Sequence, residues 1–481
     1  MKKIYKLAVL IVVLSMALAM LAALSACNNK TDKFIVYNWE EYISDDVKDG
    51  FAQYYKAKTG KDIIVEYSTF DTNEIMLTKI INGDANVDVI CPSEYAIERL
   101  LRKGLLAKLD KAAMPNYSNI DPMIIDNIDA NFSEVATPDG KVNMNDYFVP
   151  YMWGTLGLLY NTDKVKQEDL AQGWGLLWNK ANNPTLEGKI LMKDSIRDAI
   201  AATVFYLKEN NRLPSGLEDK TAQELINTVD PSLLSAIETA LKEQKPHLKG
   251  YEVDFGKDDM LNGLAYVDLA WSGDALWAIE EGDNLDYYVP ESGSNIWFDG
   301  WVIPTASTKK DVAMLWIDYL CDPVKAMENM MEIGYTAGVS PQVFQESESA
   351  LAILQDNEYD KEDFFADARR YPTDVEHLGI MKDLDEFSDQ AVDMWERVKA
   401  EGHGPNVWVI VFSILGGLII VGGAVIYFLT VKKRRRFTVS RPALAKMEIS
   451  EQPLAPNAEA EQAIKEPKAE KEDWQENQPK E

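Results

Sequence analysis

The stretch "AWSGDA" at residues 270–275 combines two side chains that together can hold a cation. An apolar run typical of a buried strand ends in Trp271, and Asp274 follows three residues later. The face of an aromatic ring attracts positive charge, and a carboxylate accepts charge-assisted hydrogen bonds from an ammonium group. On its own, such a pair is more often made of half-buried packing residues at the end of a strand.

The same pairing recurs where other predicted strands end. Strands expected at 34–38, 62–68 and 87–95 alternate with helices expected at 44–58, 71–83 and 95–102, with Ser44 as an N-cap, an Asp71–Glu74 capping box and Gly83 as a helix end. This alternation predicts right-handed crossovers and a mostly parallel sheet, in which ligands bind beyond the carboxyl ends of the strands. The residues expected at such ends, there and further along the chain, are Trp39, Glu40, Tyr42, Ser93, Tyr95, Asp194, Ser195, Asp198, Trp271, Asp274, Trp297, Asp299 and Tyr335.

This set of side chains suits a linear aliphatic amine. Tryptophan and tyrosine rings give flat apolar walls for a methylene chain, and carboxylates pair with ammonium groups. We expect no matching set of Lys, Arg or His, so an anion or a sugar phosphate would fit poorly. No glycine-rich phosphate loop opens any of the expected helices.

Catalysis finds little support in the sequence. The three histidines, His247, His377 and His403, are far in sequence from the strand-end acids, and Ser272 lacks the Gly-x-Ser-x-Gly frame of a nucleophile elbow. Paired carboxylates could hydrolyse a glycoside, but no acid is singled out as a proton donor. We therefore predict a protein that is not an enzyme and has neither a cofactor nor a metal.

The N-terminus has the pattern of a secretory signal. Lysines are followed by an apolar run and small residues, which predicts a signal peptide at 1–26 and a tether at 27–33. The ending "LSAC" resembles the lipobox of bacterial lipoproteins, and this resemblance implies cleavage before Cys27 and a lipid on its thiol. The alternative is an uncleaved membrane anchor that contains a cysteine by chance.

A second apolar run, 407–431, contains no charge and is directly followed by five basic residues. It is long enough to cross a bilayer, and the basic cluster predicts a cytoplasmic C-terminus. The tail, 432–481, has a composition typical of disorder. Residues 28–406 would then lie on the extracytoplasmic face of the cell membrane, held by a lipid anchor and one spanning helix. The alternative for 407–431 is a buried core helix.

The net charge argues against one class of ligand, and the cysteine content limits the disulfide bonds that can form. The formal net charge of −29 argues against binding nucleic acid, because phosphate contacts need basic surface. Besides Cys27, only Cys91 and Cys321 are present, both in apolar surroundings. We expect two buried free thiols, with a single bridge between them as the alternative.

Several separate blocks of the sequence resemble the bacterial spermidine/putrescine-binding proteins of ABC transporters. The blocks are "YNWEEY", "STFDTNE", "DVICPSEY", "VPYMWGT", "AWSGDA", "WFDGWVIP" and "IGYTAG", and they cover roughly residues 33–402. The resemblance implies an α/β, two-lobe periplasmic-binding-protein fold (type II-like) with crossing inter-lobe strands. We expect the binding domain at 34–403, with lobe 1 at about 34–146 and 300–340, and lobe 2 at about 147–299 with 341–403 packing on it.

The resemblance also implies roles for individual positions. An aromatic box around the methylene chain would consist of Trp39, Tyr42, Tyr95, Trp271, Trp297 and Tyr335. Asp299 would be the principal carboxylate for one ammonium, Glu40 a polar or acidic contact, and Ser93 a hydrogen-bond partner near one amine. Asp274 matches an acid of putrescine-preferring members, and Asp198 stands where the family usually has Glu. Ser195 replaces an acid of spermidine-preferring members, so putrescine and spermidine both remain open.

The implied function is a receptor that captures a polyamine by lobe closure and delivers it to an ABC permease. One alternative is a membrane-anchored sensor of a polyamine or small organic cation, but no signalling domain is recognisable after residue 436. Another is an amino-acid ligand, which would need an arginine for its carboxylate. Arg197 is the only arginine near the candidate site, and it could instead pair with Asp194 or Asp198.

Overall fold

The computed structural model describes residues 32–400. The contact pattern divides the chain into two units, 1–404 and 405–481, and the description below concerns the first of them. The predicted signal peptide, Cys27, nearly all of the tether, the helix expected at 407–431 and the tail lie outside the described residues. Within residues 32–400, no helix combines the length and the apolar character that crossing a bilayer requires.

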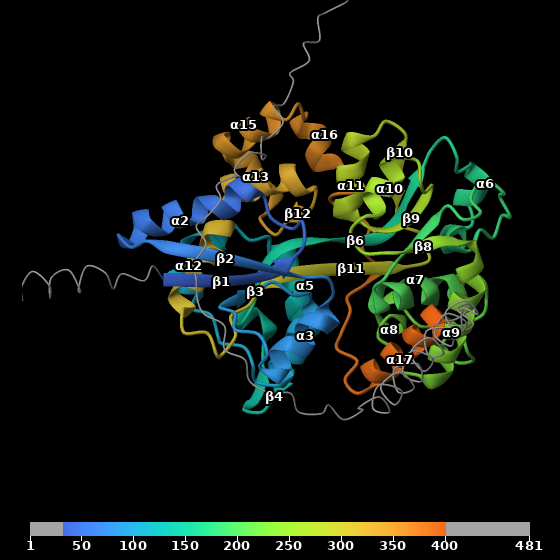
Figure 1. Cartoon of the computed structure of the whole chain (residues 1–481), viewed down its shortest axis with the longest axis horizontal. Helices are drawn as coiled ribbons and strands as arrows, with labels where there is room; N and C mark the ends of the chain where they lie inside the picture. The colour runs from blue at the N-terminus through green and yellow to red at the C-terminus, as the bar shows by residue number, and fades with distance from the viewer. Residues whose placement is uncertain (1–31, 401–481) are drawn as a thin grey trace, which may run out of the picture. The chain divides into compact units, whose positions relative to one another are not determined.

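A three-stranded parallel sheet forms the centre of the first lobe (Figure 1). Its strand order is β2-β1-β3, and it alternates along the chain with helices as predicted: β1 (Asp32–Trp39), α2 (Asp45–Thr59), β2 (Ile63–Phe70), α3 (Asn73–Asn82), β3 (Val89–Ile90) and α4 (Glu94–Arg102). Successive side chains of β1 point to opposite faces of the sheet. Phe34 and Val36 therefore pack with Phe51 of α2, whereas Tyr37 packs in a separate cluster with Leu77 of α3.

Helix ends in this lobe follow the predicted chemistry with one change. Ser44 occupies the N-cap position of α2 in an extended conformation, and Gly83 ends α3 with a left-handed φ of 74°. The N-cap of α3 is Thr72, whose hydroxyl accepts a hydrogen bond from the Ile75 amide, so the predicted capping box at Asp71 is wrong. The helix starts at Asn73, and Thr72 is the residue positioned to satisfy its free amide groups.

The second sheet has eight strands and is mixed rather than mostly parallel. Its order is β13-β11-β6-β9-β7-β8, and β10 and β12 also pair with β6. Strand β6 runs antiparallel to β9 and β11, whereas β7 is parallel to β8 and β9. The strands are β6 (Val149–Asn161), β7 (Ile190–Lys193), β8 (Leu248–Glu252), β9 (Val267–Trp271), β10 (Leu285–Tyr288), β11 (Ser294–Trp301), β12 (Thr336–Ala337) and β13 (Leu378–Gly379).

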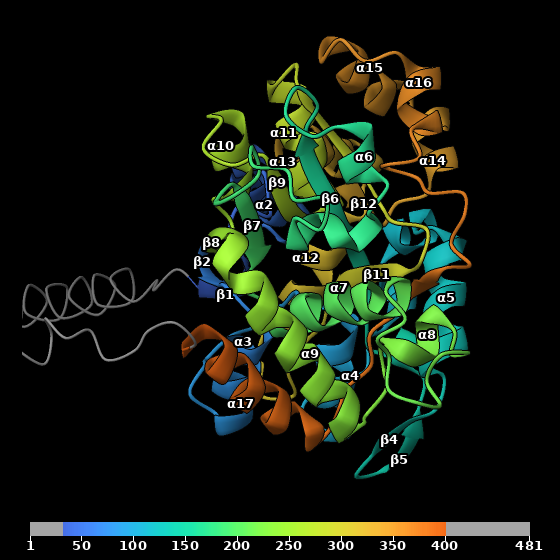
Figure 2. The same ribbon diagram turned by 90° about the vertical axis from the view of Figure 1, so that its right-hand side faces the viewer.

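Strands β6 and β11 cross between the lobes side by side, which confirms the crossing strand expected at 147–161 (Figures 1 and 2). All thirteen residues of β6 are buried. Val149 and Met152 pack in the cluster of the first lobe, and Leu156 and Leu158 pack in the cluster of the second. A third crossing segment was not predicted: β13 pairs with β11, and the chain then continues into α17 (Phe387–Ala400).

The remaining helices and one hairpin cover the two sheets. In the second lobe, α7 and α9 contribute to one continuous apolar cluster, which also takes up α17 through Met394 and Trp395. The elements not yet introduced are β4 (Val135–Thr137), β5 (Gly140–Val142), α5 (Pro122–Phe132), α6 (Gln167–Leu170), α7 (Ile196–Glu209), α8 (Ala222–Leu225), α9 (Pro231–Gln244), α10 (Gly256–Leu261), α11 (Ser272–Glu281), α12 (Lys310–Leu320), α13 (Pro323–Ile333), α14 (Pro341–Glu346), α15 (Glu348–Asp356) and α16 (Lys361–Ala366).

The segment after residue 340 packs differently from the expectation. Phe344 of α14, Leu354 of α15 and Phe364 of α16 belong to the same cluster as Phe51 and thus to the first lobe. Only α17 packs on the second lobe. The physical reason is local, because α15 packs against α13, which precedes it closely in the chain and already covers the first lobe.

The two cysteines are free and buried, as predicted. Cys91 and Cys321 both lie in the apolar cluster of the first lobe and form no disulfide. Burial raises the pKa of both thiols well above the ordinary range, so both are protonated at neutral pH.

Candidate functional site

One cavity between the lobes is lined by all eleven residues that the sequence predicted to bind ligand. Its volume is about 70 Å³, and its walls come from both lobes and from β11. The predicted residues around it are Trp39, Glu40, Tyr42, Ser93, Tyr95, Asp198, Trp271, Asp274, Trp297, Asp299 and Tyr335. The carboxyl ends of β1, β3, β7 and β9 meet here, which is where an open α/β sheet binds ligands.

Three carboxylates of the cavity sit in the first turn of a helix that directly follows a strand. Glu94 opens α4 after β3, Asp198 lies in the first turn of α7 after β7, and Asp274 lies in the first turn of α11 after β9. The N-terminus of a helix carries partial positive charge, which favours a carboxylate there. The partial positive charges at these helix ends therefore stabilise the carboxylates around the cavity, so not every carboxylate needs a cation as its partner.

Asp299 lies on β11, and its side chain is buried and hydrogen-bonded to the first lobe. The Tyr42 hydroxyl donates to its Oδ2 atom at 3.0 Å, and its backbone forms a bridge with Ser93. The Oδ1 atom is buried and has no hydrogen-bond partner among residues 32–400. Burial raises the pKa of Asp299 to about 7, although hydrogen bonding of the carboxyl group to the Ser93 and Tyr42 side chains lowers it, and the nearby charge of Asp198 adds to the rise.

Asp198 occupies a comparable position in the second lobe. The indole Nε1 of Trp271 donates to its Oδ2 atom at 3.2 Å, and burial raises the pKa of this carboxyl group. Within the described part of the chain, neither Asp198 nor Asp299 forms an ion pair. The cavity therefore holds two buried carboxylates that lack a cationic partner, which is an unfavourable arrangement unless a cation binds.

Aromatic rings pack closely around these acids. The rings of Tyr42 and Tyr335 meet edge to face with centroids 4.7 Å apart, and Trp297 lies 5.8 Å from Tyr335. Gly273 explains the glycine of "AWSGD", because a Cβ atom there would lie 2.2 Å from the Tyr335 ring. The indole Nε1 groups of Trp39 and Trp297 are buried and have no partner among residues 32–400.

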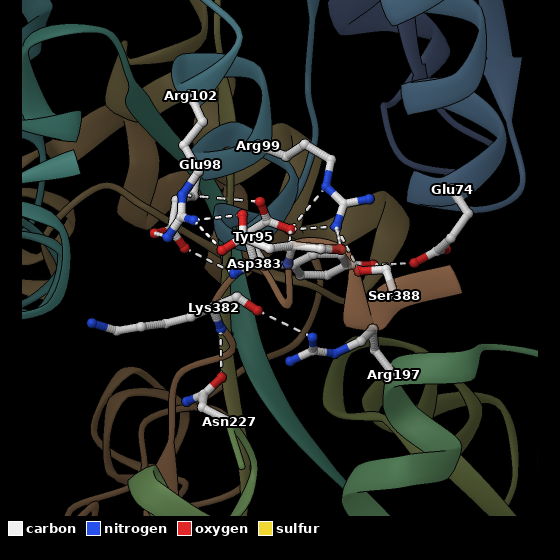
Figure 3. Close-up of polar contacts among 11 residues, drawn as sticks. Glu74, Tyr95, Glu98, Arg99, Arg102, Arg197, Asn227, Lys382, Asp383 and Ser388 are labelled. Atoms are coloured by element: carbon white, nitrogen blue, oxygen red, sulfur yellow. Dashed lines mark hydrogen bonds and ion pairs between the residues drawn. The ribbon is translucent and has the colours of Figure 1, made fainter. Parts of the chain in front are cut away.

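Tyr95 and Ser93 are held by a polar network at the start of α4. Asn73 donates to the Ser93 hydroxyl at 2.9 Å and to the Tyr95 hydroxyl at 3.0 Å. Tyr95 in turn donates to Glu74 at 3.1 Å, as Figure 3 shows. Neither Asn73 nor Glu74 was predicted to bind ligand, although both belong to the block "STFDTNE" and line the cavity. Glu40, in contrast, is an exposed residue at the edge of the cavity.

Glu94 was also missed, although it stands between two selected residues. It is fully buried, and its Oε2 atom accepts a hydrogen bond from the Phe298 amide at 2.9 Å. Burial raises its pKa to about 8, so the group is mainly neutral at pH 7. Its place at the first position of a helix after a strand was the signal that could have identified it.

The expectation that no basic side chains accompany the acids is wrong. Lys193, Arg197 and Lys257 line the cavity together with eleven carboxylates. Lys193 pairs with Glu252 at 2.6 Å and with Asp274 at 3.5 Å, and Lys257 lies 3.6 Å from the other oxygen of Asp274. Sequence distance concealed this arrangement, because Lys193 ends a strand that lies far from the "AWSGD" segment in the chain.

Arg197 does not form the predicted pair with Asp194 or Asp198. Its Nη1 group donates to the Lys382 carbonyl at 3.1 Å, and its guanidinium lies 5.1 Å from the Tyr95 ring centre (Figure 3). Asp194 instead accepts a hydrogen bond from the indole of Trp395 at 2.9 Å. The third crossing segment and the aromatic face therefore engage only part of the guanidinium, because its Nε and Nη2 atoms are buried and have no hydrogen-bond partner among residues 32–400.

In the part of the chain that the structure describes, no group of three or more His, Cys, Asp or Glu side chains is placed to hold a metal ion. The buried carboxylates are interleaved with aromatic rings and with the ammonium groups of lysines, an arrangement suited to an organic cation.

Comparisons with known proteins identify the family and the fold of this chain. Residues 50–357 match the model of the family described as bacterial extracellular solute-binding protein. The spermidine/putrescine-binding periplasmic protein of Escherichia coli (strain K12) is 29% identical over 323 residues, which cover 67% of this chain and 81% of that protein. The putrescine-binding periplasmic protein PotF of the same organism is 28% identical over 300 residues, covering 60% of this chain and 73% of that protein.

A solved structure gives the same result for the fold. The spermidine/putrescine ABC transporter substrate-binding protein PotD of Streptococcus pneumoniae superimposes with a TM-score of 0.55 at 28% identity, covering 77% of this chain and 99% of that chain. The two-lobe α/β fold implied by the resemblance is thereby confirmed. Because the family model spans more than half of its residues, the chain belongs to the family of bacterial extracellular solute-binding proteins.

Proposed function

We propose that this protein is an extracytoplasmic receptor that captures a polyamine, putrescine or spermidine, in the cavity between its lobes. Lobe closure would bury the ligand, and an ABC permease would receive it for import. The process requires differential affinity of the ligand for the closed state, but no chemical step and no cofactor.

One observation carries the proposal: a buried carboxylate oxygen, Asp299 Oδ1, has no partner among residues 32–400 and faces an aromatic cavity. Burying a charged or polar group without a partner is costly, so a native protein retains one where a ligand completes it. A primary ammonium supplies both the charge and the hydrogen-bond donor that Asp299 lacks. The methylene chain would then lie against Tyr335, Trp297 and the other rings of the box.

The names of the relatives support the same class of ligand. The Escherichia coli relatives are described as binding spermidine/putrescine and putrescine, and the Streptococcus pneumoniae protein as the substrate-binding component of an ABC transporter. Anchoring by a lipid on Cys27 and by a helix at 407–431 remains part of the proposal. Either anchor would hold the receptor at the membrane near its permease.

Isothermal titration calorimetry of the full-length protein, purified in mild detergent, tests the function directly. The ligands are putrescine, cadaverine, spermidine and spermine, with lysine, glutamate and maltose as controls. We expect one-to-one binding of at least one di- or triamine and no heat from glutamate or maltose. If a protein shown to be folded by circular dichroism binds none of the amines, the proposed function is wrong and the family membership carries only the fold.

A further inference from the structure

Asp274 already has a cation on each of its two carboxylate oxygens. Lys193 Nζ lies 3.5 Å from Oδ2, and Lys257 Nζ lies 3.6 Å from Oδ1. Lys257 also pairs with Glu41 at 2.7 Å, so it joins the second lobe to the segment after β1. The acid that the sequence analysis assigned to a ligand ammonium is thus neutralised by the protein itself.

The surroundings of Lys193 are those that a bound ammonium group requires. Its Nζ atom lies 2.6 Å from Glu252 Oε1, 2.6 Å from the Val253 carbonyl oxygen and 4.3 Å from the centre of the Trp271 ring. The side chain is 1% exposed. The Val253 carbonyl accepts a hydrogen bond from the ammonium, two carboxylates supply counter-charge, and the ring face adds a cation–π contact. This is a complete ammonium site, and a residue of the chain fills it.

The Trp271 indole separates this filled site from the free acids. Its face contacts Lys193, whereas its Nε1 group donates to Asp198. Asp198 and Asp299 are the two predicted ligand acids that are both buried and free of an ion pair among residues 32–400. Two unpaired carboxylates match the two ammonium groups of a diamine, and a third ammonium would find its place taken.

We propose that Lys193 occupies one amine subsite of the cavity as a built-in cation and thereby makes this receptor selective for a diamine over a triamine. This inference rests on the proposed function and deepens it. A triamine would have to displace the Lys193 ammonium, which would leave that ammonium buried without its counter-charges. Charge therefore excludes the longer ligand at the Asp274 end of the cavity, in addition to any effect of shape.

The test compares the affinities of putrescine and spermidine for the full-length protein and three variants, measured by calorimetry. Lys193→Met empties the subsite, and Lys193→Met/Glu252→Gln does so while removing one charge of each sign, which preserves the net charge of the cluster. Lys189→Met is the matched control: Lys189 precedes the same strand and lies 4.9 Å from the Tyr266 ring centre, but it does not line the cavity. Circular dichroism and thermal unfolding establish that each variant is folded.

We expect the parent protein to bind putrescine at least about tenfold more tightly than spermidine. We expect both Lys193 variants to shift this ratio at least about tenfold toward spermidine, and Lys189→Met to leave it unchanged. Equal or tighter binding of spermidine by the parent overturns the inference but leaves the proposed function standing. So does an unchanged ratio in a folded Lys193 variant. If no amine binds to the folded parent protein, the proposed function itself fails, and this inference fails with it. If both Lys193 variants are unfolded, the ratio of putrescine affinity to spermidine affinity of the parent protein decides whether the inference stands.

Discussion

The Tyr42 hydroxyl donates a hydrogen bond to Asp299 Oδ2 at 3.0 Å across a separation of 257 residues. Tyr42 follows β1 of the first lobe, and Asp299 lies on a strand that crosses between the lobes. The contact uses one oxygen of the carboxylate and leaves the other without a partner among the described residues. The arrangement orients Asp299 before any ligand arrives.

Replacing Asp299 by Asn should remove most of the polyamine affinity. The substitution keeps an acceptor for Tyr42 but removes the counter-charge of a desolvated ammonium, and truncating one member of a buried charge pair costs roughly 2–5 kcal/mol. Calorimetry with putrescine and spermidine measures the loss. Asp286→Asn is the matched control, because Asp286 accepts a similar 3.1 Å hydrogen bond from Tyr160 outside the cavity. Parent-like affinity of the Asp299 variant would show that the site is assigned wrongly.

Polyamine affinity should fall as the solution becomes more acidic. The pKa of Asp299 is raised to about 7 in the empty protein, so the group must lose a proton to pair with an ammonium below that pH. Amine pKa values near 10 keep the ligand charged throughout. The dissociation constant should rise by about tenfold per unit as pH decreases below 7. The titratable groups that face Asp299 are Tyr42, Cys91, Glu94, Asp198 and Tyr335.

Calorimetry in two buffers of different ionisation enthalpy checks this linkage. At pH 7, where Asp299 is about half protonated in the empty protein, binding should release about half a proton, and the apparent enthalpy should differ between the buffers by the corresponding amount. The Asp299→Asn variant, wherever its residual affinity is measurable, should show a flatter pH profile. A parent affinity that stays constant from pH 8 to pH 5.5 would contradict the role of Asp299.

Truncating Trp271 should weaken binding without unfolding the protein. Its ring contacts the Lys193 ammonium and its indole donates to Asp198, so Trp271→Ala removes both an aromatic wall and the donor that holds a ligand acid. A desolvated cation–π contact contributes about 2 kcal/mol. Trp271→Phe should retain part of the affinity, because it keeps a ring but loses the N–H group. The control is Trp277→Ala, since Trp277 also carries a lysine, Lys257, near its ring but does not line the cavity.

The neutral form of Glu94 should stabilise the empty protein. Its pKa is raised to about 8 in the fold and is near 4.3 in an unfolded chain. A raised carboxyl pKa means that the stabilisation is fully present below the unfolded value and is lost as pH rises through 8. Because this loss begins above the unfolded pKa and is complete only above pH 8, Glu94→Gln should raise the unfolding temperature relative to the parent at pH 9 and by a smaller amount at pH 6. Thermal unfolding at both pH values measures this, with the exposed Glu281→Gln as control. A lower unfolding temperature of Glu94→Gln at pH 9 would contradict the prediction.

The C-terminal half of α4 ties the third crossing segment to the first lobe (Figure 3). Arg99 pairs with the buried Asp383, and Glu98 accepts a hydrogen bond from the Asp383 amide at 2.8 Å. Arg99→Met should lower the free energy of unfolding by about 1–3 kcal/mol, because a buried carboxylate loses both guanidinium donors of Arg99 and its Oδ1 atom keeps only the Asp385 amide. Denaturant unfolding checks this value. The control is Arg212→Met, since Arg212 pairs with Glu243 at the surface and such a pair contributes at most about 1 kcal/mol. Equal losses of unfolding free energy in both variants would show that the Arg99–Asp383 pair contributes no more than a surface ion pair.

Local patterns were sufficient to predict much of the site. Short segments rich in apolar and β-branched residues identified β1 and β2, and longer apolar runs identified the crossing strand β6 and the strand β9 that ends in Trp271. Because parallel strands bring their carboxyl ends to one edge, residues as distant in sequence as Trp39 and Asp274 were correctly expected around one cavity. Tyr335 was also expected at the end of a strand, but it lies between the helix α13 and the short strand β12. The ligand-binding roles of these residues remain predictions.

What the sequence by itself determined is the chemical character of the site, an aromatic and acidic cavity at the ends of strands, because residue types and strand ends are local properties. Only the tertiary structure decided which acids are free. Lys193 and Asp274 come from different strand–helix connections, and they meet because β7 and β9 are adjacent in the sheet. The packing of α14 to α16 on the first lobe depended likewise on neighbouring surfaces. Burial and pairing arise from contacts between distant segments, and these contacts distinguish Asp299, which forms no ion pair among residues 32–400, from Asp274, which has two.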